Sequence, residues 1–357
     1  MSSAMLAEIH EIPGVVRLLR DDGADETARV AAAIRTARPR VIVIAARGTS
    51  DHAAVYARYL LESHLRLPVV LAADSLVTIY RRSMAWDGAL VIGISQSGEG
   101  PDVAAVLSAA RHDGALTVAI TNEPESALAG VAEHTLLCRA GVERAVAATK
   151  TYVAELAVVA ALVADLTLPD ASGAAEDLSA AMVALPDVLA RVVAASDAWL
   201  ERDDSLVEAL AASDRALVVS RGYDYATALE VALKLKETSR IFADGYSAAD
   251  LLHGPLALAG PAIPTLVFRP DGRMGAAIDA SIDRAREIGA RPWIVGGREL
   301  ARLAAGPRSI VLPVDLPEAL TPLAFALPGQ LVAESVARRR GMDPDAPPGL
   351  TKVTRTL

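Results

Sequence analysis

The stretch ALVIGISQSGEGPD, residues 89–102, decides the fold of this 357-residue chain. Its first six residues form an apolar run of the kind found in buried strands, and Pro101 is well placed to begin a helix. The polar residues between them would then lie at the carboxyl end of a strand. Ligands of open α/β sheets bind at that end, so this stretch predicts both a fold and a place for a ligand.

Short apolar runs recur on both sides of this stretch. Further strands are expected at 41–46, 69–72, 116–121, 134–138, 216–220, 263–268, 291–295 and 309–312. Segments long enough for crossover helices separate them, which predicts mostly parallel sheets with helices on both faces. The expected fold class is therefore α/β, a flavodoxin-like three-layer sandwich that occurs twice.

The chain reads as two related halves. In each half a strand is followed by Arg-Gly and a helix, with Arg47 and Arg221 in matching positions, although a shared turn could also arise by chance. The length suits two domains. We expect the first at 1–170 with an N-terminal helix, a helical connector at 171–212 and the second at 213–340. The tail, 341–357, has no periodicity, and is either frayed or held by the fold for a purpose.

Composition excludes several classes of protein. Asp and Glu (44) outnumber Lys and Arg (35), and the net charge of −9 argues against a nucleic-acid surface. The single cysteine, Cys138, excludes an intramolecular disulfide and fits a reducing, cytoplasmic location. The N-terminus lacks a long apolar run, and the run at 154–166 is shorter than a membrane helix requires, so no membrane association is expected. The six histidines are scattered, so we expect no metal, and no cofactor is implied.

Two polar loops are candidates for binding an anion. Ser95, Gln96 and Ser97 would add side-chain donors to loop amides and a helix N-terminus, which suits a phosphate monoester. Thr49 and Ser50 follow the strand at 41–46 and could reach the same ligand. The alternative is that these residues form ordinary turns and helix caps.

Three further candidates are ionisable. Lys234 and Glu237 share one helical face with Glu230, which is usually a solvated face of salt bridges but could present a base. His253 precedes Gly-Pro in a rigid loop and could exchange a proton, although a lone loop histidine is more often structural. Lys352 would by default be a solvated tail lysine, or it could form an imine with a carbonyl substrate.

Taken together, these motifs resemble the double-SIS (sugar isomerase) family, which includes stand-alone glucosamine-6-phosphate deaminases and the isomerase half of glucosamine-6-phosphate synthase. The resemblance runs from about residue 40 to the end of the chain. Six pieces carry it in family order: RGTSDHA (47–53), SQSGEGPD (95–102), AVAATKTY (145–152), ALEVALKLKE (228–237), LLHGPLAL (251–258) and GLTKV (349–353).

The resemblance implies a role for each candidate. Ser95, Gln96 and Ser97 would bind the sugar phosphate, with Thr49 and Ser50 in the same pocket. Glu237 would move a proton between C1 and C2, and Lys234 would line that pocket. His253 of a neighbouring subunit would open the sugar ring, which implies a homodimer with shared active sites. Lys352 would engage the open-chain sugar, and the tail would close over the active site.

Some residues depart from the family pattern. Gly100 stands where the family usually places a Thr or Ser hydroxyl against the phosphate, so one contact is missing. Residue 2 is Ser2, not the nucleophilic cysteine of a glutaminase domain, and the chain leaves no room for such a domain. Glutamine-dependent synthesis is therefore not expected. Pro101-Asp102, Ala148 and Thr238 are more similar to the deaminase branch.

The expected reaction is the conversion of glucosamine 6-phosphate and water into fructose 6-phosphate and ammonia. Alternatives with the same pocket are a deglycase acting on fructosamine-type phosphates and another aldose–ketose isomerase. A non-catalytic sugar-phosphate sensor is the alternative from a different class. Glu237, His253 and Lys352 speak against the sensor, as does the lack of a basic DNA-binding extension.

Overall fold

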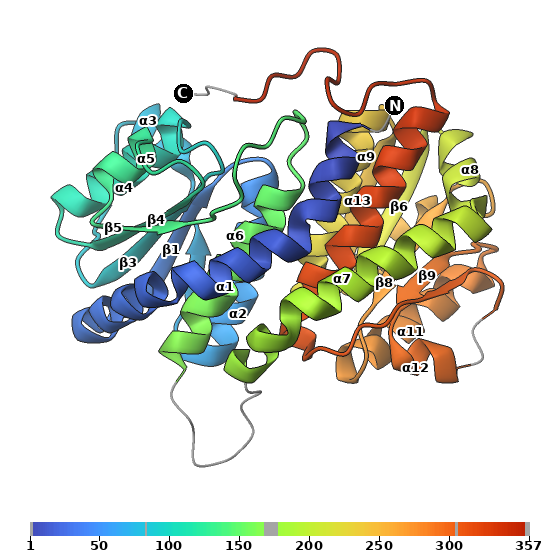
Figure 1. The fold of residues 1–357 in the computed structure, drawn as a ribbon, viewed down its shortest axis with the longest axis horizontal. Coiled ribbons are helices and arrows are strands. Elements are labelled where there is room, and N and C mark those ends of the chain that lie inside the picture. The colour runs from blue at the N-terminus through green and yellow to red at the C-terminus, as the bar shows by residue number, and fades with distance from the viewer. Residues whose placement is uncertain (1–2, 83, 168–177, 304–305, 354–357) are drawn as a thin grey trace. The chain divides into compact units, whose positions relative to one another are not determined.

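The computed structural model describes residues 3–82, 84–167, 178–303 and 306–353, which form two compact units. One unit, here called the N-terminal unit, comprises Gly14–Glu143, Lys150–Ala184 and Thr351–Leu357. The other, the C-terminal unit, comprises Met1–Pro13, Arg144–Thr149 and Leu185–Leu350. Each unit is built around one five-stranded parallel sheet (Figure 1).

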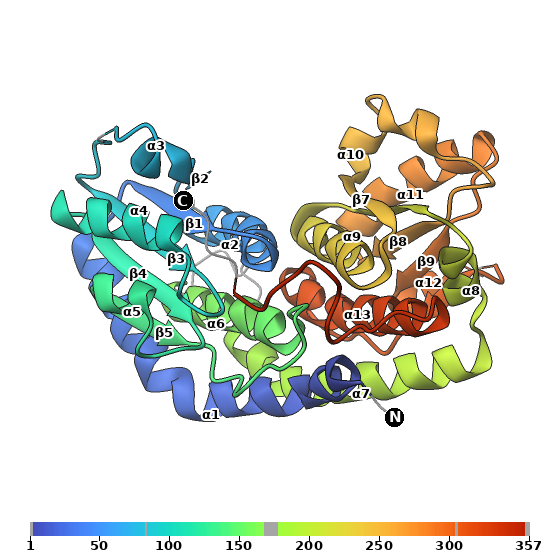
Figure 2. The same ribbon diagram turned by 90° about the horizontal axis from the view of Figure 1, so that it is seen from above.

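The sheet of the N-terminal unit has the order β2-β1-β3-β4-β5. Its strands are β1 (Val41–Ala46), β2 (Val69–Leu71), β3 (Ala89–Ile94), β4 (Leu116–Thr121) and β5 (His134–Leu137). Its helices are α1 (Ala4–Ala37, from Gly14 onward), α2 (Thr49–Leu65), α3 (Asp74–Thr78), α4 (Pro101–His112), α5 (Ala127–Val131) and α6 (Lys150–Leu166). Helices α2 and α4 lie on opposite sides of the strands, which makes three layers (Figure 2).

Burial explains why these apolar runs became strands. All six residues of β3 are buried, as expected for a central strand covered by helices on both faces. On one face, Val91 packs with Val103, Val106 and Leu107 of α4. A strand that buries both faces can be uniformly apolar, and this is why the sequence reads as a continuous run.

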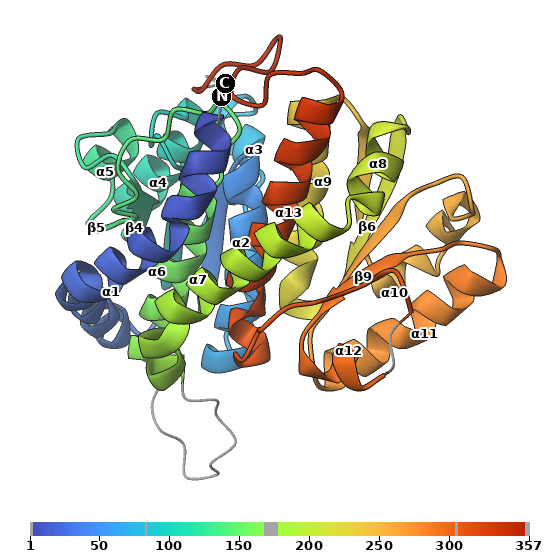
Figure 3. The same ribbon diagram turned by 45° about the vertical axis from the view of Figure 1, so that its right-hand side comes forward.

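The C-terminal unit repeats the topology, with the order β10-β9-β8-β6-β7. Its strands are β6 (Arg215–Ser220), β7 (Phe242–Ser247), β8 (Thr265–Arg269), β9 (Trp293–Gly296) and β10 (Ser309–Val311). Its longer helices are α7 (Leu178–Arg202, from Leu185 onward), α8 (Ser205–Ala211), α9 (Tyr225–Ser239), α11 (Arg273–Glu287) and α13 (Thr321–Arg339). Shorter helical turns are η1 (Gly222–Asp224), α10 (Ala248–Leu251), η2 (Pro255–Leu258), α12 (Arg298–Arg302) and η3 (Glu318–Leu320). Figure 3 shows α12 beside β9.

The α/β fold class is confirmed, and read from the second strand of each half both sheets have the order 2-1-3-4-5. In this order the chain reverses direction across the sheet between the first and third strands, and ligands of such folds bind at that switch point. In the N-terminal unit the switch point lies between the ends of β1 and β3, where the two predicted polar loops begin.

Strand β7 was not predicted from the sequence. Its residues, FADGYS, include Asp244 and Gly245, which are residue types depleted in strands. The strand lies at the edge of its sheet and pairs only with β6. Backbone pairing with a neighbour therefore overrides the local sequence preference here.

Helix α9, which carries two of the predicted site residues, packs tightly on α13. A Cβ atom at Gly329 of α13 would lie 2.2 Å from Cγ2 of Val231 on α9, so only glycine permits this approach. One side of α9 is thereby enclosed, which matters for the ionisable residues on that helix.

Helix α7 is the one described helix long and apolar enough to cross a membrane by length and composition. Its residues Leu185, Leu189 and Val192 are fully buried in the C-terminal unit. Spacing of three and four residues puts them on one face, which is the pattern of a core helix.

The described part of the tail is held by specific contacts. The Asp345 carboxylate accepts hydrogen bonds from the amides of Ala4 and Met5 at 2.7 and 2.8 Å, and so caps the first turn of α1. The Asp345 carbonyl accepts a further bond from the amide of Val146 at 2.9 Å. Of the two alternatives for the tail, these contacts favour a segment held by the fold.

Candidate active site

The loop Ser95-Gln96-Ser97-Gly98 connects β3 to α4 in a tight turn. Gly98 has a φ of +62°, and a Cβ atom there would lie 2.1 Å from Oγ of Ser126. Both the backbone conformation and the space require glycine. The loop conformation is therefore fixed by the sequence and by packing against Ser126.

Several donors in this loop are available to a ligand. Among the described residues, no backbone carbonyl accepts a hydrogen bond from the amides of Gln96 and Ser97. The Ser95 and Ser97 hydroxyls accept bonds from the amides of Gly98 and Glu99, at 3.1 and 3.3 Å, which leaves their own protons to donate. The N-terminus of the 12-residue helix α4 follows immediately and favours negative charge. The arrangement is that of an anion site.

A cavity of about 500 Å³ in the N-terminal unit adjoins this loop. It is lined by Gln96, Ser97, Glu99, Glu123, Pro124, Glu125, Ser126, Val142, Glu143, Lys352 and Val353. The structure thus brings the predicted tail lysine to the predicted phosphate loop. The Lys352 ammonium lies 2.7 Å from Oε2 of Glu143, whose side chain is buried.

The second predicted loop begins α2 at the end of β1. Thr49 is half-buried at the start of the helix. The Ser50 hydroxyl is buried and donates to Oε1 of Glu155 on α6 at 2.8 Å. Ser50 therefore anchors α2 to α6, and its oxygen remains able to accept a hydrogen bond.

Arg47 ties three loops of the N-terminal unit together. Its guanidinium lies 2.7 Å from Asp102 in the first turn of α4 and 3.1 Å from Asp74 in α3. Both carboxylates are buried. Burial raises the pKa of Asp74 to about 6, against the opposing effect of the Arg47 cation. The contacts of Arg47 fix the loops after β1, β2 and β3 at the switch point.

In the C-terminal unit, the face predicted on α9 exists but is not solvated. Lys234 is completely buried and lies 2.6 Å from Oε2 of Glu237 and 3.4 Å from Oε1 of Glu230. Glu230 is also completely buried, whereas the Glu237 side chain is 22% exposed. The ion pair with Lys234 holds the Glu237 carboxylate in position.

His253 lies in the exposed turn between α10 and η2. Within the described ranges, no hydrogen bond or ion pair joins its ring to Glu237 or Lys234 of the same unit. The predicted histidine is thus accessible, and its own unit does not place it beside the predicted base.

The equivalent of the phosphate loop in the C-terminal unit follows β8 and is already occupied by protein groups. Glu299 accepts a hydrogen bond from the amide of Gly272 at 2.9 Å and pairs with Arg269 at 3.4 Å. Arg269 also pairs with Asp279 at 2.8 Å. A carboxylate of the protein takes the place of an anion, so of the two repeats only the N-terminal one has this site open.

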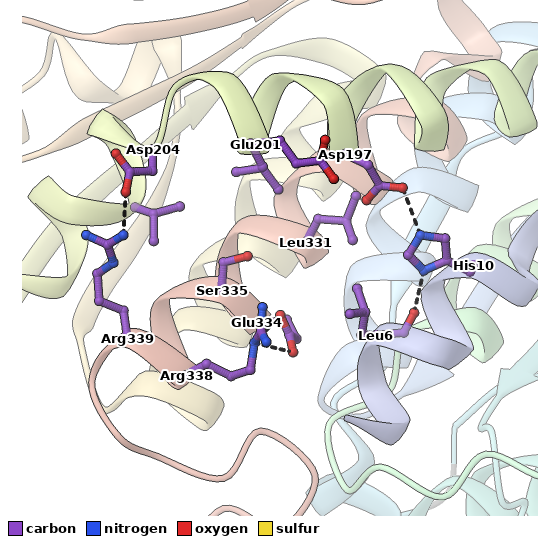
Figure 4. Close-up of a pocket in the computed structure, with 12 residues that line it drawn as sticks. Leu6, His10, Asp197, Glu201, Asp204, Leu331, Glu334, Ser335, Arg338 and Arg339 are labelled. Atoms are coloured by element: carbon purple, nitrogen blue, oxygen red, sulfur yellow. Dashed lines mark hydrogen bonds and ion pairs between the residues drawn. The ribbon is translucent and has the colours of Figure 1, made fainter. Parts of the chain in front are cut away.

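A larger cavity, of about 680 Å³, lies in the C-terminal unit and contains none of the predicted residues (Figure 4). Six of its charged side chains are paired with one another: His10 with Asp197 at 2.8 Å, Arg338 with Glu334 at 3.0 Å, and Arg339 with Asp204. Most charges of this cavity are paired, whereas the loop after β3 has donors available to a ligand, so that loop is the candidate active site.

Sequence reasoning missed Glu143, which lines the cavity and holds Lys352. The signal was weak, because Glu143 lies two positions before the motif AVAATKTY in a stretch without periodicity. Within the described ranges, no group of three or more His, Cys, Asp or Glu side chains could hold a metal ion.

Comparison with known proteins identifies similar sequences and folds. The sequence profile of the SIS domain matches residues 34–164 and 209–334. A glutamine–fructose-6-phosphate aminotransferase (isomerizing) from Methanothermobacter thermautotrophicus is 38% identical over 354 residues, which is 98% of this chain and 56% of that protein. The chain therefore spans little more than half the length of this relative.

Solved structures of similar fold are also known. The structure of a candidate phosphosugar isomerase from Silicibacter pomeroyi has a TM-score of 0.83 at 36% identity and covers 96% of this chain and 100% of its own. A glucosamine-6-phosphate deaminase from Thermotoga maritima has a TM-score of 0.74 over 99% of this chain and 100% of its own. Its 19% identity shows likeness of fold alone.

Proposed function

The chain belongs to the SIS domain family as a tandem of two SIS domains, and on this premise we propose that it is a phosphosugar isomerase whose reaction releases ammonia. The specific proposal is glucosamine 6-phosphate and water to fructose 6-phosphate and ammonia. One observation carries it: Lys352 lines one cavity together with Gln96 and Ser97, whose amides donate to no backbone carbonyl in the described part of the chain.

The loop after β3 suits the phosphate group of such a substrate. Two amides, two serine hydroxyls and a helix N-terminus can together donate to several phosphate oxygens. A dianion held there would leave the sugar carbons to extend into the cavity beside Lys352. We propose that Ser95, Gln96 and Ser97 bind the phosphate and that Thr49 and Ser50 support them.

The proton transfer is assigned to Glu237. Its carboxylate is partly exposed, and the Lys234 ammonium at 2.6 Å holds it in position. In the proposed reaction His253 of a partner subunit assists ring opening, and Glu237 moves the proton from C2 to C1. The resulting imine at C2 adds water and loses ammonia, which leaves the ketose. A general acid–base step of this kind contributes about 10²–10⁴ in rate.

The first experiment is to incubate the protein with glucosamine 6-phosphate and follow fructose 6-phosphate and free ammonia together. Equal amounts of both products support the proposal. Ketose without ammonia would indicate simple isomerisation, and activity only on fructosamine-type phosphates would indicate a deglycase. Binding without turnover of any of these substrates would indicate a non-catalytic sugar-phosphate sensor.

The second experiment is Glu237→Gln, which keeps the shape and removes the base. We expect the turnover number to fall by about 10²–10⁴. Lys236→Gln is the matched control, since Lys236 is adjacent, exposed and outside the cluster. Wild-type turnover in Glu237→Gln would refute the assignment.

We also propose that the protein is a homodimer in which each active site contains residues of both subunits. The exposure of His253 supports a role toward a partner subunit. If His253 acts in trans, mixing Glu237→Gln and His253→Ala subunits restores about a quarter to a half of wild-type activity in heterodimers, because one of the two sites is intact. No recovery upon mixing, in a sample where heterodimers are demonstrated, would place His253 and Glu237 of one chain in the same site.

A further inference from the structure

The Glu143 carboxylate is a buried charge in the wall of the proposed substrate cavity. It lies between β5 and α6, and its side chain has no exposed surface. Its donors in the same unit include the amide of Thr151 at 3.1 Å, the hydroxyl of Thr151 at 2.6 Å and the ammonium of Lys352 at 2.7 Å. A buried carboxylate is costly unless it is paired and hydrogen-bonded, and these contacts supply both.

The three donors have different roles. Thr151 lies in the first turn of α6 and binds both carboxylate oxygens, so it fixes the orientation of Glu143 relative to the helix. Lys352 is the only one of the three that comes from the tail, 209 positions away in the sequence, and it brings the positive charge. Thr151 thus fixes the Glu143 carboxylate in the fold, and the carboxylate in turn binds Lys352 of the tail.

We infer that Glu143 is a positioning residue: it holds the ammonium of Lys352 at the loop Gln96-Ser97, so that the tail lysine lies where the sugar carbons of a bound phosphosugar would be. The effect of this position on catalysis rests on the proposed function. Glu143 acts through Lys352 and needs no contact with the substrate.

The chain offers a clean chemical test, because it contains only four lysines: Lys150, Lys234, Lys236 and Lys352. Lys150 and Lys234 are buried and Lys236 is exposed, so Lys236 serves as the internal reference for amine reactivity. Acetylation by an N-hydroxysuccinimide ester, followed by mass spectrometry of the peptides, gives the rate at each lysine without any substrate.

We expect Lys352 in the wild type to be acetylated more slowly than Lys236, and Glu143→Gln to raise the Lys352 rate by about three- to tenfold, as loss of an ion pair releases the amine. The matched control is Glu123→Gln, which removes a carboxylate from the same cavity wall, since within the described ranges no ion pair joins Glu123 to Lys352. An unchanged Lys352 rate in Glu143→Gln, or the same increase in Glu123→Gln, would overturn the inference.

The second test is a double-mutant cycle with Glu143→Gln and Lys352→Met. If Glu143 acts through Lys352, Glu143→Gln lowers turnover by about 10- to 100-fold in the wild type and by less than about twofold in Lys352→Met. A residue that only stabilised the fold would give losses that multiply. Multiplied losses therefore refute the positioning role.

Failure of the positioning role of Glu143 and failure of the proposed function give different results. Labelling needs no substrate, so an unchanged Lys352 rate refutes the role of Glu143 even when the protein turns over sugar phosphates. Absence of turnover in the wild type refutes the proposed function instead, whatever the labelling result.

Discussion

Arg47 donates from Nε to Oδ2 of Asp102 at 2.7 Å and so joins the loop after β1 to the helix that follows the phosphate loop. Its terminal nitrogen Nη2 lies 3.1 Å from Oδ2 of Asp74. The two carboxylates are buried, whereas half of the Arg47 side chain faces solvent. One cation thus holds in place the loops that line the ligand side of the sheet.

Arg47→Met is expected to destabilise the protein, because two buried carboxylates lose their cation. We expect a loss of about 1–3 kcal/mol in the free energy of unfolding, together with weaker binding of fructose 6-phosphate. Denaturant unfolding and calorimetry measure the two effects. The control is Arg40→Met, whose ion pair with Asp87 is exposed and should change stability by less than about 1 kcal/mol. Equal effects of the two substitutions would contradict the role of Arg47.

Gly98→Ala is expected to abolish phosphate binding. The φ of +62° is strained for alanine, and its Cβ would collide with Ser126, so the loop must move. Gly130→Ala is the control, since Gly130 lies in α5 with ordinary φ and no atom within 4 Å of the added Cβ. Titration with fructose 6-phosphate should show lost affinity for the first variant only. Unaltered affinity in Gly98→Ala would show that the loop conformation does not matter.

Gly100→Ser is expected to tighten phosphate binding. The position has a φ of −67°, and the nearest atom to an added Cβ, Oδ1 of Asp102, is 3.4 Å away, so a side chain fits. The new hydroxyl would supply the contact that the family usually has, worth about 0.5–1.5 kcal/mol, or roughly two- to tenfold in affinity. Gly100→Ala, which adds the Cβ without the hydroxyl, should leave affinity near that of the wild type. If both variants bind alike, the hydroxyl makes no contact.

Fructose 6-phosphate is expected to protect Lys352 from acetylation, because the lysine and the phosphate loop line one cavity. The rate at Lys352 should fall several-fold at saturation, while the rate at exposed Lys236 stays constant. Fructose without the phosphate should protect far less at the same concentration. Protection of both lysines, or of neither, would argue against ligand binding in this cavity.

Asp224 is expected to make the protein less stable as the pH rises. Burial raises the pKa of this carboxyl from 3.8 to about 8, although the hydroxyls of Thr321 and Thr227 oppose the shift. Between these two pKa values the folded state holds a proton on Asp224 that the unfolded state has lost. The stability that this proton gives the folded state is therefore complete below about pH 4 and is lost by about pH 8. Each pKa unit corresponds to about 1.4 kcal/mol.

The variant Asp224→Asn tests this effect. It stays neutral at every pH, so its free energy of unfolding should decline less than that of the wild type between pH 5 and pH 8. Denaturant unfolding at unit pH steps measures the difference. Parallel curves for the two proteins would mean that Asp224 is ionised in the folded state at neutral pH.

The sequence by itself determined the fold class, nine of the ten strands and the loop that suits an anion. Uniform apolar runs such as 89–94 predict strands buried on both faces, and Pro101 marks the helix start. These features are local, because strand patterning and turn chemistry depend on neighbouring residues. β7 was not predicted, because its stability comes from backbone pairing with β6.

The tertiary structure decided which polar residues serve a ligand and which serve the fold. It assigned the Ser50 hydroxyl to Glu155, enclosed Lys234 between two carboxylates, and filled the second copy of the anion loop with Glu299. It also brought Lys352 to Glu143 across 209 positions. No sequence pattern encodes such contacts, because hydrogen bonding and burial depend on packing between segments that are distant along the chain.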